Sequence, residues 1–455
     1  MKIVVGGATS AGKSIVAYLS MGNNDIVVVD EDASTLDDVA KLYDVQPVLG
    51  SISNPDVQQS VGMNTADMLI AVTDSDEVNL IACQVAYTLF NVPKKIARVD
   101  SKYFLNPMWN ALYNEKSLPV DLVITPDIEI GKYILNLFEF PGCSAVFPFE
   151  NNSINIFSFQ NKNAESPFTG FAVSHINEKL AEDGAKIVLI GRENKILLTD
   201  SETLVLQKND MVYVCCPSKA NQDIMRLFGI DHNPYENVVI FGGNAISYYI
   251  ASYLEKNDNI ISCNIVEENS QNAQKLAELL TNSSIITGEA MSDVILEEAG
   301  FNSADISVAV TPKDKDNLLL ALLAAKNKDT QALSLVNSKD YKLLTGNIRN
   351  NTIIDYSLIT ISSILRYLRK ARIEDAYALG HGLGEIWEVR IGDDNTNLHK
   401  KIADLHLPQS SGVIALISKK TILPVVANYE LQPQDKLIVY VDDNDIRKIE
   451  NLFYK

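Results

Sequence analysis

The chain repeats itself, and the repeat limits the folds it can adopt. Near the start an apolar run leads into a glycine turn at Gly7, and the same order of parts returns in the second half, where an apolar run leads into Gly242. Further along, Thr73 and Thr311 lie in matching stretches, and their separation in the sequence is almost the same as that of the two glycines. Because the spacing hardly drifts, we interpret the two halves as a duplication.

Each half begins with a segment in which strands and helices alternate. Short apolar runs are separated by segments of helical period such as residues 79–90, which is typical of βα units that build a parallel sheet. We therefore predict an α/β protein with two Rossmann-like, doubly wound parallel sheets. Right-handed crossovers bring the carboxyl ends of the strands to one edge, where a nucleotide binds.

A second kind of unit also occurs twice. Residues 187–214 resemble residues 413–441, and both stretches contain short strands around turns with little helical period. We predict a small α+β domain after each Rossmann-like domain. Proline, glycine and charge clusters place the boundaries so that the four domains are residues 1–140, 141–229, 230–371 and 372–455.

The composition argues against several classes of function. A net charge of -19 repels phosphate backbones, so we expect no nucleic-acid partner. No apolar run approaches the ~18 residues of a membrane span, and the first residues lack the features of a secretory signal, so we expect a cytoplasmic protein. Five cysteines without a C-x-x-C motif and only five histidines suit reduced thiols and predict no metal site.

The first glycine loop fits two nucleotide-binding patterns. Residues 7–14 match the P-loop pattern G-x-x-x-x-G-K-[ST], and the same loop matches the Rossmann pattern G-x-G-x-x-G except that Thr9 replaces the middle glycine. Asp30 follows Gly12 by about the 20 residues that a Rossmann fold places between its loop and the acid that binds ribose, and it ends an apolar run. Glu267 ends the matching run in the second half, whose loop has no Lys-Ser pair. The duplication therefore favours the Rossmann interpretation.

The predicted cofactor-binding residues lie at the carboxyl ends of the strands in both halves. In the first half they are Gly7, Ala8, Thr9, Ser10, Ala11, Gly12, Lys13, Asp30, Gly50, Ser51, Thr73 and Arg98. In the second half they are Gly242, Gly243, Asn244, Ala245, Ile246, Glu267, Gly288, Glu289 and Thr311. Loop N–H groups can bind phosphate, the two acids can accept ribose hydroxyls, and Lys13 and Arg98 can pair with phosphate. We predict no catalytic residue and no metal ligand.

Three stretches resemble a known family. They are ADMLIAVTDSDEVNLIACQVAYTLFNVPKKIARVDS at 66–101, LFEFPG at 137–142 and QPQDKLIVYV at 432–441. Together with the tandem arrangement they resemble the regulatory TrkA subunits of bacterial Trk potassium-uptake systems, which contain potassium-conductance regulator (RCK) domains. The resemblance covers nearly the full chain and implies nucleotide-binding N-lobes followed by C-lobes. It also implies a homo-oligomer, expected to be a tetramer, that binds NAD(H) or ATP/ADP on the cytoplasmic face of the inner membrane and regulates a separate potassium-translocating membrane subunit.

The two loops depart unequally from the glycine pattern. The first loses one glycine, at Thr9, and the second loses two, at Asn244 and Ser247. We expect Thr9 to weaken binding, because a β-branched residue disfavours positive φ and its side chain lies where a pyrophosphate approaches, whereas Asn244 tolerates a left-handed backbone. We nevertheless expect the first site to bind more tightly, because it adds Lys13 and Arg98. The corresponding places in the second half hold Tyr249 and Asn337.

Two other functions remain open at this point. An NAD-dependent oxidoreductase would use the small α+β domains for substrate, but each is under about 90 residues and offers no acid-base pair. A P-loop NTPase would need the Walker match to be genuine. We expect a non-catalytic gating subunit, because the nucleotide-binding unit is duplicated and no catalytic pair lies near the predicted edge.

Overall fold

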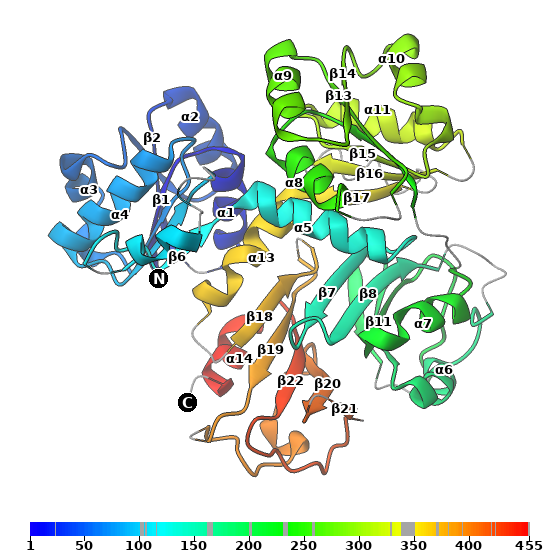
Figure 1. Ribbon diagram of the computed structural model, residues 1–455. Coiled ribbons are helices and arrows are strands. Elements are labelled where there is room, and N and C mark those ends of the chain that lie inside the picture. Colours follow the sequence, from blue (N-terminus) through cyan, green and yellow to red (C-terminus); the bar gives the residue numbers. More distant parts are fainter. Residues whose placement is uncertain are drawn as a thin grey trace. The chain divides into compact units, whose positions relative to one another are not determined.

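The computed structural model of the chain describes most of its residues (Figure 1). The described residues are 1–453 except 23, 101–103, 105–106, 115, 162–166, 200–202, 231–234, 257–259, 328–329, 338–350, 370–372, 381, 394, 420 and 424. The boundary predicted at residues 371 and 372 lies outside them, and the four domain boundaries stay a prediction. The chain separates into two compact units, Met1–Ile130 with Asp355–Tyr367 and Gly131–Ile354 with Leu368–Lys455.

The first N-lobe is a six-stranded sheet in the order β3-β2-β1-β4-β5-β6, and all its neighbouring strands are parallel. Its strands are β1 (Lys2–Gly6), β2 (Asp25–Asp30), β3 (Gln46–Leu49), β4 (Met68–Ala71), β5 (Lys94–Arg98) and β6 (Leu122–Ile124). Its helices are α1 (Ser10–Leu19), α2 (Ala33–Leu42), α3 (Pro55–Ser60), α4 (Asp76–Phe90) and α5 (Pro126–Glu139). The predicted doubly wound sheet is confirmed, with its switch point between β1 and β4.

The second N-lobe repeats this order as β14-β13-β12-β15-β16-β17. Its strands are β12 (Asn237–Phe241), β13 (Ser262–Glu267), β14 (Ser284–Thr287), β15 (Ile306–Ala309), β16 (Gln331–Val336) and β17 (Asn351–Asp355). Its helices are α8 (Ala245–Leu254), α9 (Ser270–Leu279), α10 (Asp293–Glu298), α11 (Asp314–Ala324) and α13 (Tyr356–Leu368). The switch point again lies beside the first strand of the lobe, between β12 and β15.

The central strands are continuous apolar runs because both faces of a doubly wound sheet are covered. Ile3, Val4 and Val5 of β1 are buried, as are Ile240 and Phe241 of β12. The apolar runs end where the chain turns into the glycine loops. The packing of the sheet therefore fixes where each loop begins.

Each C-lobe is built on a five-stranded antiparallel sheet, in the order β10-β9-β11-β8-β7 in the first and β18-β19-β22-β20-β21 in the second. The first contains β7 (Ala145–Phe149), β8 (Ile154–Gln160), α6 (Val173–Leu180), β9 (Lys186–Arg192), β10 (Lys195–Leu198), β11 (Met211–Pro217) and α7 (Asn221–Leu227). The second contains β18 (Ile373–Ala378), β19 (Glu385–Arg390), β20 (Gly412–Ser418), β21 (Thr421–Leu423), β22 (Lys436–Val441) and α14 (Ile446–Phe453). The predicted α+β class of these lobes is confirmed.

The two C-lobes share one hydrophobic core. Phe147 and Ile156 of the first lobe belong to the same buried cluster as Ile386 and Ile438 of the second. At the margin of this core the Lys436 ammonium of β22 contacts three carboxylates, those of Glu150, Glu374 and Glu388. Because Glu150 comes from the first lobe, this ion cluster joins the two C-lobes.

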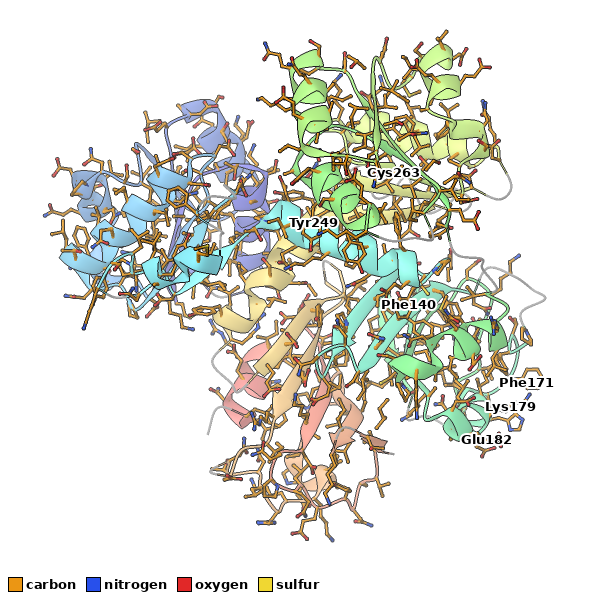
Figure 2. All side chains as sticks on the ribbon, in the orientation of Figure 1. Phe140, Phe171, Lys179, Glu182, Tyr249 and Cys263 are labelled. Carbon is orange, nitrogen blue, oxygen red and sulfur yellow. The ribbon has the colours of Figure 1, made fainter. Side chains whose placement is uncertain are left out.

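Two helices leave the lobe in which their βα unit began. Helix α13 follows the second sheet, yet the Ser357 hydroxyl lies 2.9 Å from the Ser14 hydroxyl of α1, and both are buried. In the other unit, α5 follows the first sheet, yet a Cβ added to its Gly131 would lie 2.6 Å from the Tyr249 ring of α8 (Figure 2). Each glycine-loop helix therefore packs against the last helix of the other half's N-lobe.

Candidate functional site

The first loop needs glycine at two of the predicted positions. Gly7 has φ +105°, and a Cβ there would lie 2.6 Å from the backbone nitrogen of Thr73. A Cβ on Gly12, in the first turn of α1, would lie 1.9 Å from the Gly7 carbonyl oxygen. The chain therefore doubles back too closely for side chains at these two positions, which is how a Rossmann loop lets phosphate approach the helix.

Thr9 is the N-cap of α1, with φ −62° and ψ 177°. Its hydroxyl donates to the Val72 carbonyl at 2.8 Å and accepts from the Gly12 N–H at 3.3 Å. The expectation that this position needs positive φ is wrong, because an N-cap has an extended backbone that threonine adopts easily. The cap interaction turns the Thr9 hydroxyl toward the end of β4.

The first loop keeps backbone donors available. Within the described part of the chain, the N–H groups of Thr9, Ser10 and Ala11 have no recorded acceptor, as expected for the first turn of a helix. Lys13 is exposed on the same turn. These groups can form an anion site at the positive end of α1.

The second loop satisfies most of its own donors. Gly242 has φ +106°, and Asn244 is the N-cap of α8 in a reciprocal capping box with Ser247. The side-chain oxygen of Asn244 accepts from the N–H groups of Ile246 and Ser247, while the Ser247 hydroxyl accepts from the Asn244 N–H. Ala245 alone keeps an N–H without a recorded acceptor among residues 244–247, all of which are described.

The capping arrangement also explains the glycine losses. The Asn244 amide donates to the Val310 carbonyl at 2.6 Å, as Thr9 does to Val72, and its φ of −122° needs no left-handed backbone. Counted from the caps of the two helices, Tyr248 rather than the predicted Tyr249 occupies the place of Lys13. The second loop therefore has no cation at this position, as expected, but the residue that stands there is Tyr248 and not Tyr249.

The predicted ribose acids end the second strand of each sheet. The Asp30 carboxylate accepts from the Ala8 N–H at 2.5 Å and from the Asp32 N–H at 2.9 Å. The Glu267 carboxylate accepts from the Gly243 N–H and, at 2.8 Å, from the Asn269 N–H. Both acids are thus held beside the second residue of their glycine loop, where the free lone pairs can accept the hydroxyls of a ribose.

The turn after the third strand lies beside each acid. Gly50 donates its N–H to the Asp30 carbonyl at 2.8 Å, and Gly288 donates to the Glu267 carbonyl at 3.0 Å. A Cβ on Gly50 would lie 2.8 Å from the Val57 side chain, so the turn approaches α3 closely. The predicted neighbours Ser51 and Glu289 follow these glycines directly.

Two buried asparagines complete the edge, and our sequence analysis did not assign them to the site. Asn79 accepts from the Thr73 N–H and hydroxyl at 2.9 and 2.8 Å, and it donates to the carbonyls of Thr73 and Arg98. Asn317 makes the same contacts with Thr311 and donates to Leu335. The repeat spacing matched the two asparagines and was the signal that could have identified them. Thr73 and Thr311 are therefore held by these side chains.

Arg98 lies at the predicted edge but is already paired. Its guanidinium contacts Asp74 at 3.1 Å and Asp100 at 2.7 Å, and only 14% of the side chain is exposed. Burial disfavours the charged form, but Asp100 and the other acidic groups nearby together outweigh it and raise the pKa of Arg98. Burial and Asp100 raise the pKa of the neighbouring Asp127. A phosphate must therefore compete with these carboxylates for Arg98.

The second half has no arginine at the place of Arg98. Asn79 and Asn317 donate to Arg98 and Leu335 respectively, so Leu335 rather than Asn337 occupies the place of Arg98. Asn337 instead donates its backbone N–H to Asp314, as Asp100 does to Asp76. Leu335 is uncharged, as is Asn337, which the sequence analysis had assigned to this place.

The Walker match is not supported by the environment of its last residue. In a P-loop this hydroxyl binds magnesium. The Ser14 hydroxyl donates to the Ser10 carbonyl at 2.7 Å, pairs with Ser357 and is buried, so it faces away from the loop. Among the described residues, no group of three or more His, Cys, Asp or Glu side chains could hold a metal ion.

The TrkA-N domain matches residues 3–126 and 238–355, and the TrkA-C domain matches residues 386–454. The chain is 31% identical over 453 residues to the Trk system potassium uptake protein TrkA of Azorhizobium caulinodans, with 100% of this chain and 98% of that protein covered. The chain belongs to the TrkA family. The protein of the same description from Vibrio alginolyticus is 30% identical over 457 residues and is covered to 98%, with 100% of this chain.

Solved structures share the fold of this TrkA-family chain. The GsuK RCK domain has a TM-score of 0.63 at 15% identity, covering 99% of this chain and 94% of that chain. The GsuK channel bound to NAD has a TM-score of 0.62 at 14% identity, covering 99% and 79%. GsuK bound to ADP has a TM-score of 0.50 at 12% identity, covering 81% and 69%. The resemblance predicted from the sequence is confirmed.

Proposed function

We propose that this TrkA-family chain is the regulatory subunit of a Trk-type potassium-uptake system, which binds nucleotides and thereby controls potassium flux through a separate membrane subunit. The observation that carries the proposal is the pair of carboxylates, Asp30 and Glu267, each held beside a glycine loop at the switch point of a Rossmann-ordered sheet. The relatives are named as potassium uptake proteins, which supports the transport role.

The ligand class follows from the acids. A carboxylate at the end of the second strand accepts the two hydroxyls of an adenosine ribose and repels a 2′-phosphate. NAD(H), ADP and ATP carry this diol, and NADPH does not. The GsuK structures bound to NAD and to ADP support the choice of these nucleotides.

The two sites have unequal affinity in this proposal. The first offers the N–H groups of Thr9, Ser10 and Ala11 together with Lys13, whereas the capping box of the second occupies most of its donors. A phosphate bound at the first loop gains charge-assisted hydrogen bonds that the second loop supplies less well. The first site therefore binds the pyrophosphate more tightly.

Binding becomes regulation through differential affinity for two conformations. The Ser14 hydroxyl of α1 pairs with Ser357 of α13, and α13 directly follows β17 of the second sheet. A phosphate that moves the start of α1 therefore acts on a helix that continues from the other half of the chain. This supplies a route by which occupancy of the first site reaches the second N-lobe.

We also propose that the protein assembles as a homo-oligomer, a tetramer in the simplest case. Helix α4 exposes Ile81 and Leu89, at 48% and 57%, on one face, and the equivalent α11 exposes Leu322 at 49%. Such apolar residues on matching helices suit packing between copies of an N-lobe. The assembly lies at the cytoplasmic face of the inner membrane, held there by the transporter. No described helix is long and apolar enough to cross a bilayer.

The protein acts without catalysis in this proposal. All five cysteines are buried, and burial raises the pKa of Cys83 to about 12 and that of Cys263 to about 11, so neither is a reactive thiolate. The direct test is to mix purified protein with NADH or ATP and to measure binding and turnover together. We expect binding with a diol preference and no turnover. Oxidation of NADH with a carbonyl substrate, or release of phosphate from ATP, would restore an enzymatic function.

A further inference from the structure

The two ribose acids differ by one methylene group but make the same hydrogen bonds. Asp30 accepts from the N–H of loop residue Ala8 and from the residue two places after itself, Asp32. Glu267 accepts from the N–H of loop residue Gly243 and from the residue two places after itself, Asn269. The longer side chain therefore places its carboxylate at the same point of the loop as the shorter one.

The space for the extra methylene comes from the loop residue opposite. Gly243 stands where the first loop has Ala8, since each of them directly precedes the N-cap of its helix. A Cβ added to Gly243 would lie 2.7 Å from Cγ and 2.8 Å from Cβ of Glu267, closer than real Cβ contacts allow. The Glu267 side chain thus lies over the face of Gly243 where a methyl group would otherwise stand.

Gly243 is not required by its backbone. Its φ is not among the positive values that mark Gly7 and Gly242, so an alanine can adopt the conformation. The contact with Glu267 is then what an alanine would disturb. In the first half, Ala8 with the shorter Asp30 shows that a methyl group is accommodated when the acid is one carbon shorter.

We infer that Gly243 is a positioning residue that sets the diol selectivity of the second nucleotide site, by leaving room for Glu267 to reach the loop. The first half pairs Ala8 in the loop with Asp30 on the strand, whereas the second half pairs Gly243 with Glu267. The loop residue of the second half is thus one carbon smaller, and its acid is one carbon longer. The second half therefore retains a diol-selecting carboxylate in the first-half geometry, although it has lost two fingerprint glycines. This inference rests on the proposed nucleotide binding.

The experiment measures NADH and NADPH binding by nicotinamide fluorescence in the full chain. All variants carry Asp30→Ala, which removes the ribose contact of the first site and leaves the second to report. The variants are Gly243→Ala, Glu267→Asp and the double change Gly243→Ala with Glu267→Asp. We expect each single change to weaken NADH binding about tenfold, the scale of one lost charge-assisted hydrogen bond. We expect the double change to restore the affinity and the preference for NADH over NADPH.

The double variant shows whether a single change weakens binding by displacing the carboxylate or by disrupting the fold. If it binds as weakly as the single variants, or fails to fold, the inference is refuted, because the first half carries that combination. Unchanged binding in Gly243→Ala also refutes it. The mirror set, Asp30→Glu with and without Ala8→Gly in a Glu267→Ala background, should show the same loss and recovery.

One further variant distinguishes this inference from the proposed function. Asp30→Ala combined with Glu267→Ala removes both diol contacts. If this variant binds NADH as tightly as the unmodified chain, nucleotide recognition by the two acids is wrong. If it loses binding while Gly243→Ala does not, the acids bind nucleotide and only the role of Gly243 falls.

Discussion

Replacing Gly12 with alanine should weaken the first nucleotide site and leave the second unchanged. The added Cβ would lie 1.9 Å from the Gly7 carbonyl oxygen, whereas an ordinary contact begins near 3.4 Å, so the loop and α1 must separate by about 1.5 Å. Gly7 is held by its N–H bond to Val29 at 2.8 Å, so the start of α1 is the part that moves. Overpacking of this kind costs about 1–3 kcal/mol of the free energy of unfolding.

The same displacement should weaken the first nucleotide site. The N–H groups proposed to bind phosphate belong to the turn that moves, and each hydrogen bond to the charged phosphate that is lost costs roughly 1.5–3 kcal/mol of binding free energy. Calorimetric titration with NADH should therefore lose the tighter phase and retain the weaker one, with circular dichroism showing that the variant is folded.

Ser247→Ala is the matched control at the corresponding place of the second loop. It removes the capping box, which costs about 1 kcal/mol of stability, and should leave the tighter phase intact. A folded Gly12→Ala protein with both phases unchanged would refute the account of the loop.

Three other outcomes follow from the structure. Asp30→Ala should weaken the tighter NADH phase by roughly 1–3 kcal/mol and Glu267→Ala the weaker phase, as measured by calorimetry, and the reverse assignment would contradict the proposed order of the sites. Light scattering should give a mass well above the 50.2 kDa monomer, and Ile81→Glu should lower it, whereas a monomeric unmodified chain would exclude the assembly. Burial opposes ionisation of Glu255, but the hydrogen bonds from Asn282, Ser283 and Thr281 together outweigh it and lower its pKa to about 2. The stabilisation is present above the unfolded-state pKa of 4.5 and is lost as pH falls toward 2, so urea unfolding of Glu255→Gln should show a flatter loss of stability with acid than the unmodified chain.

The sequence predicted the two sheets and the two acids because they depend on local patterns. Buried parallel strands are unbroken apolar runs, and the near-constant repeat spacing identified Glu267 as the equivalent of Asp30 in the second half. The sequence did not predict the environment of Thr9, because a fingerprint glycine suggests positive φ, whereas this position is a helix N-cap whose side chain donates to the Val72 carbonyl. That acceptor directly follows β4, 63 residues away in the sequence, and leaves no local signal.

Tertiary pairing accounts for the rest of what the sequence did not predict. The contact between Ser14 and Ser357 joins residues 343 positions apart, and the periodicity of α1 and α13 does not predict it. The same is true of Gly131 against Tyr249, which only the packing of α5 on α8 reveals. The pairing of Arg98 with Asp74 and Asp100 likewise depends on how strand ends converge, so the sequence identified the cation but not its partners.

Under the proposed function, nucleotide binding to this chain controls potassium flux. The most direct test is potassium flux into vesicles that contain the Trk-type membrane subunit together with this chain, with and without NADH or ADP. We predict that nucleotide changes the flux and that the variant carrying both Asp30→Ala and Glu267→Ala, verified as folded and bound to the membrane subunit, no longer responds. Flux that is the same with and without nucleotide, under conditions where calorimetry shows the sites occupied, would contradict it.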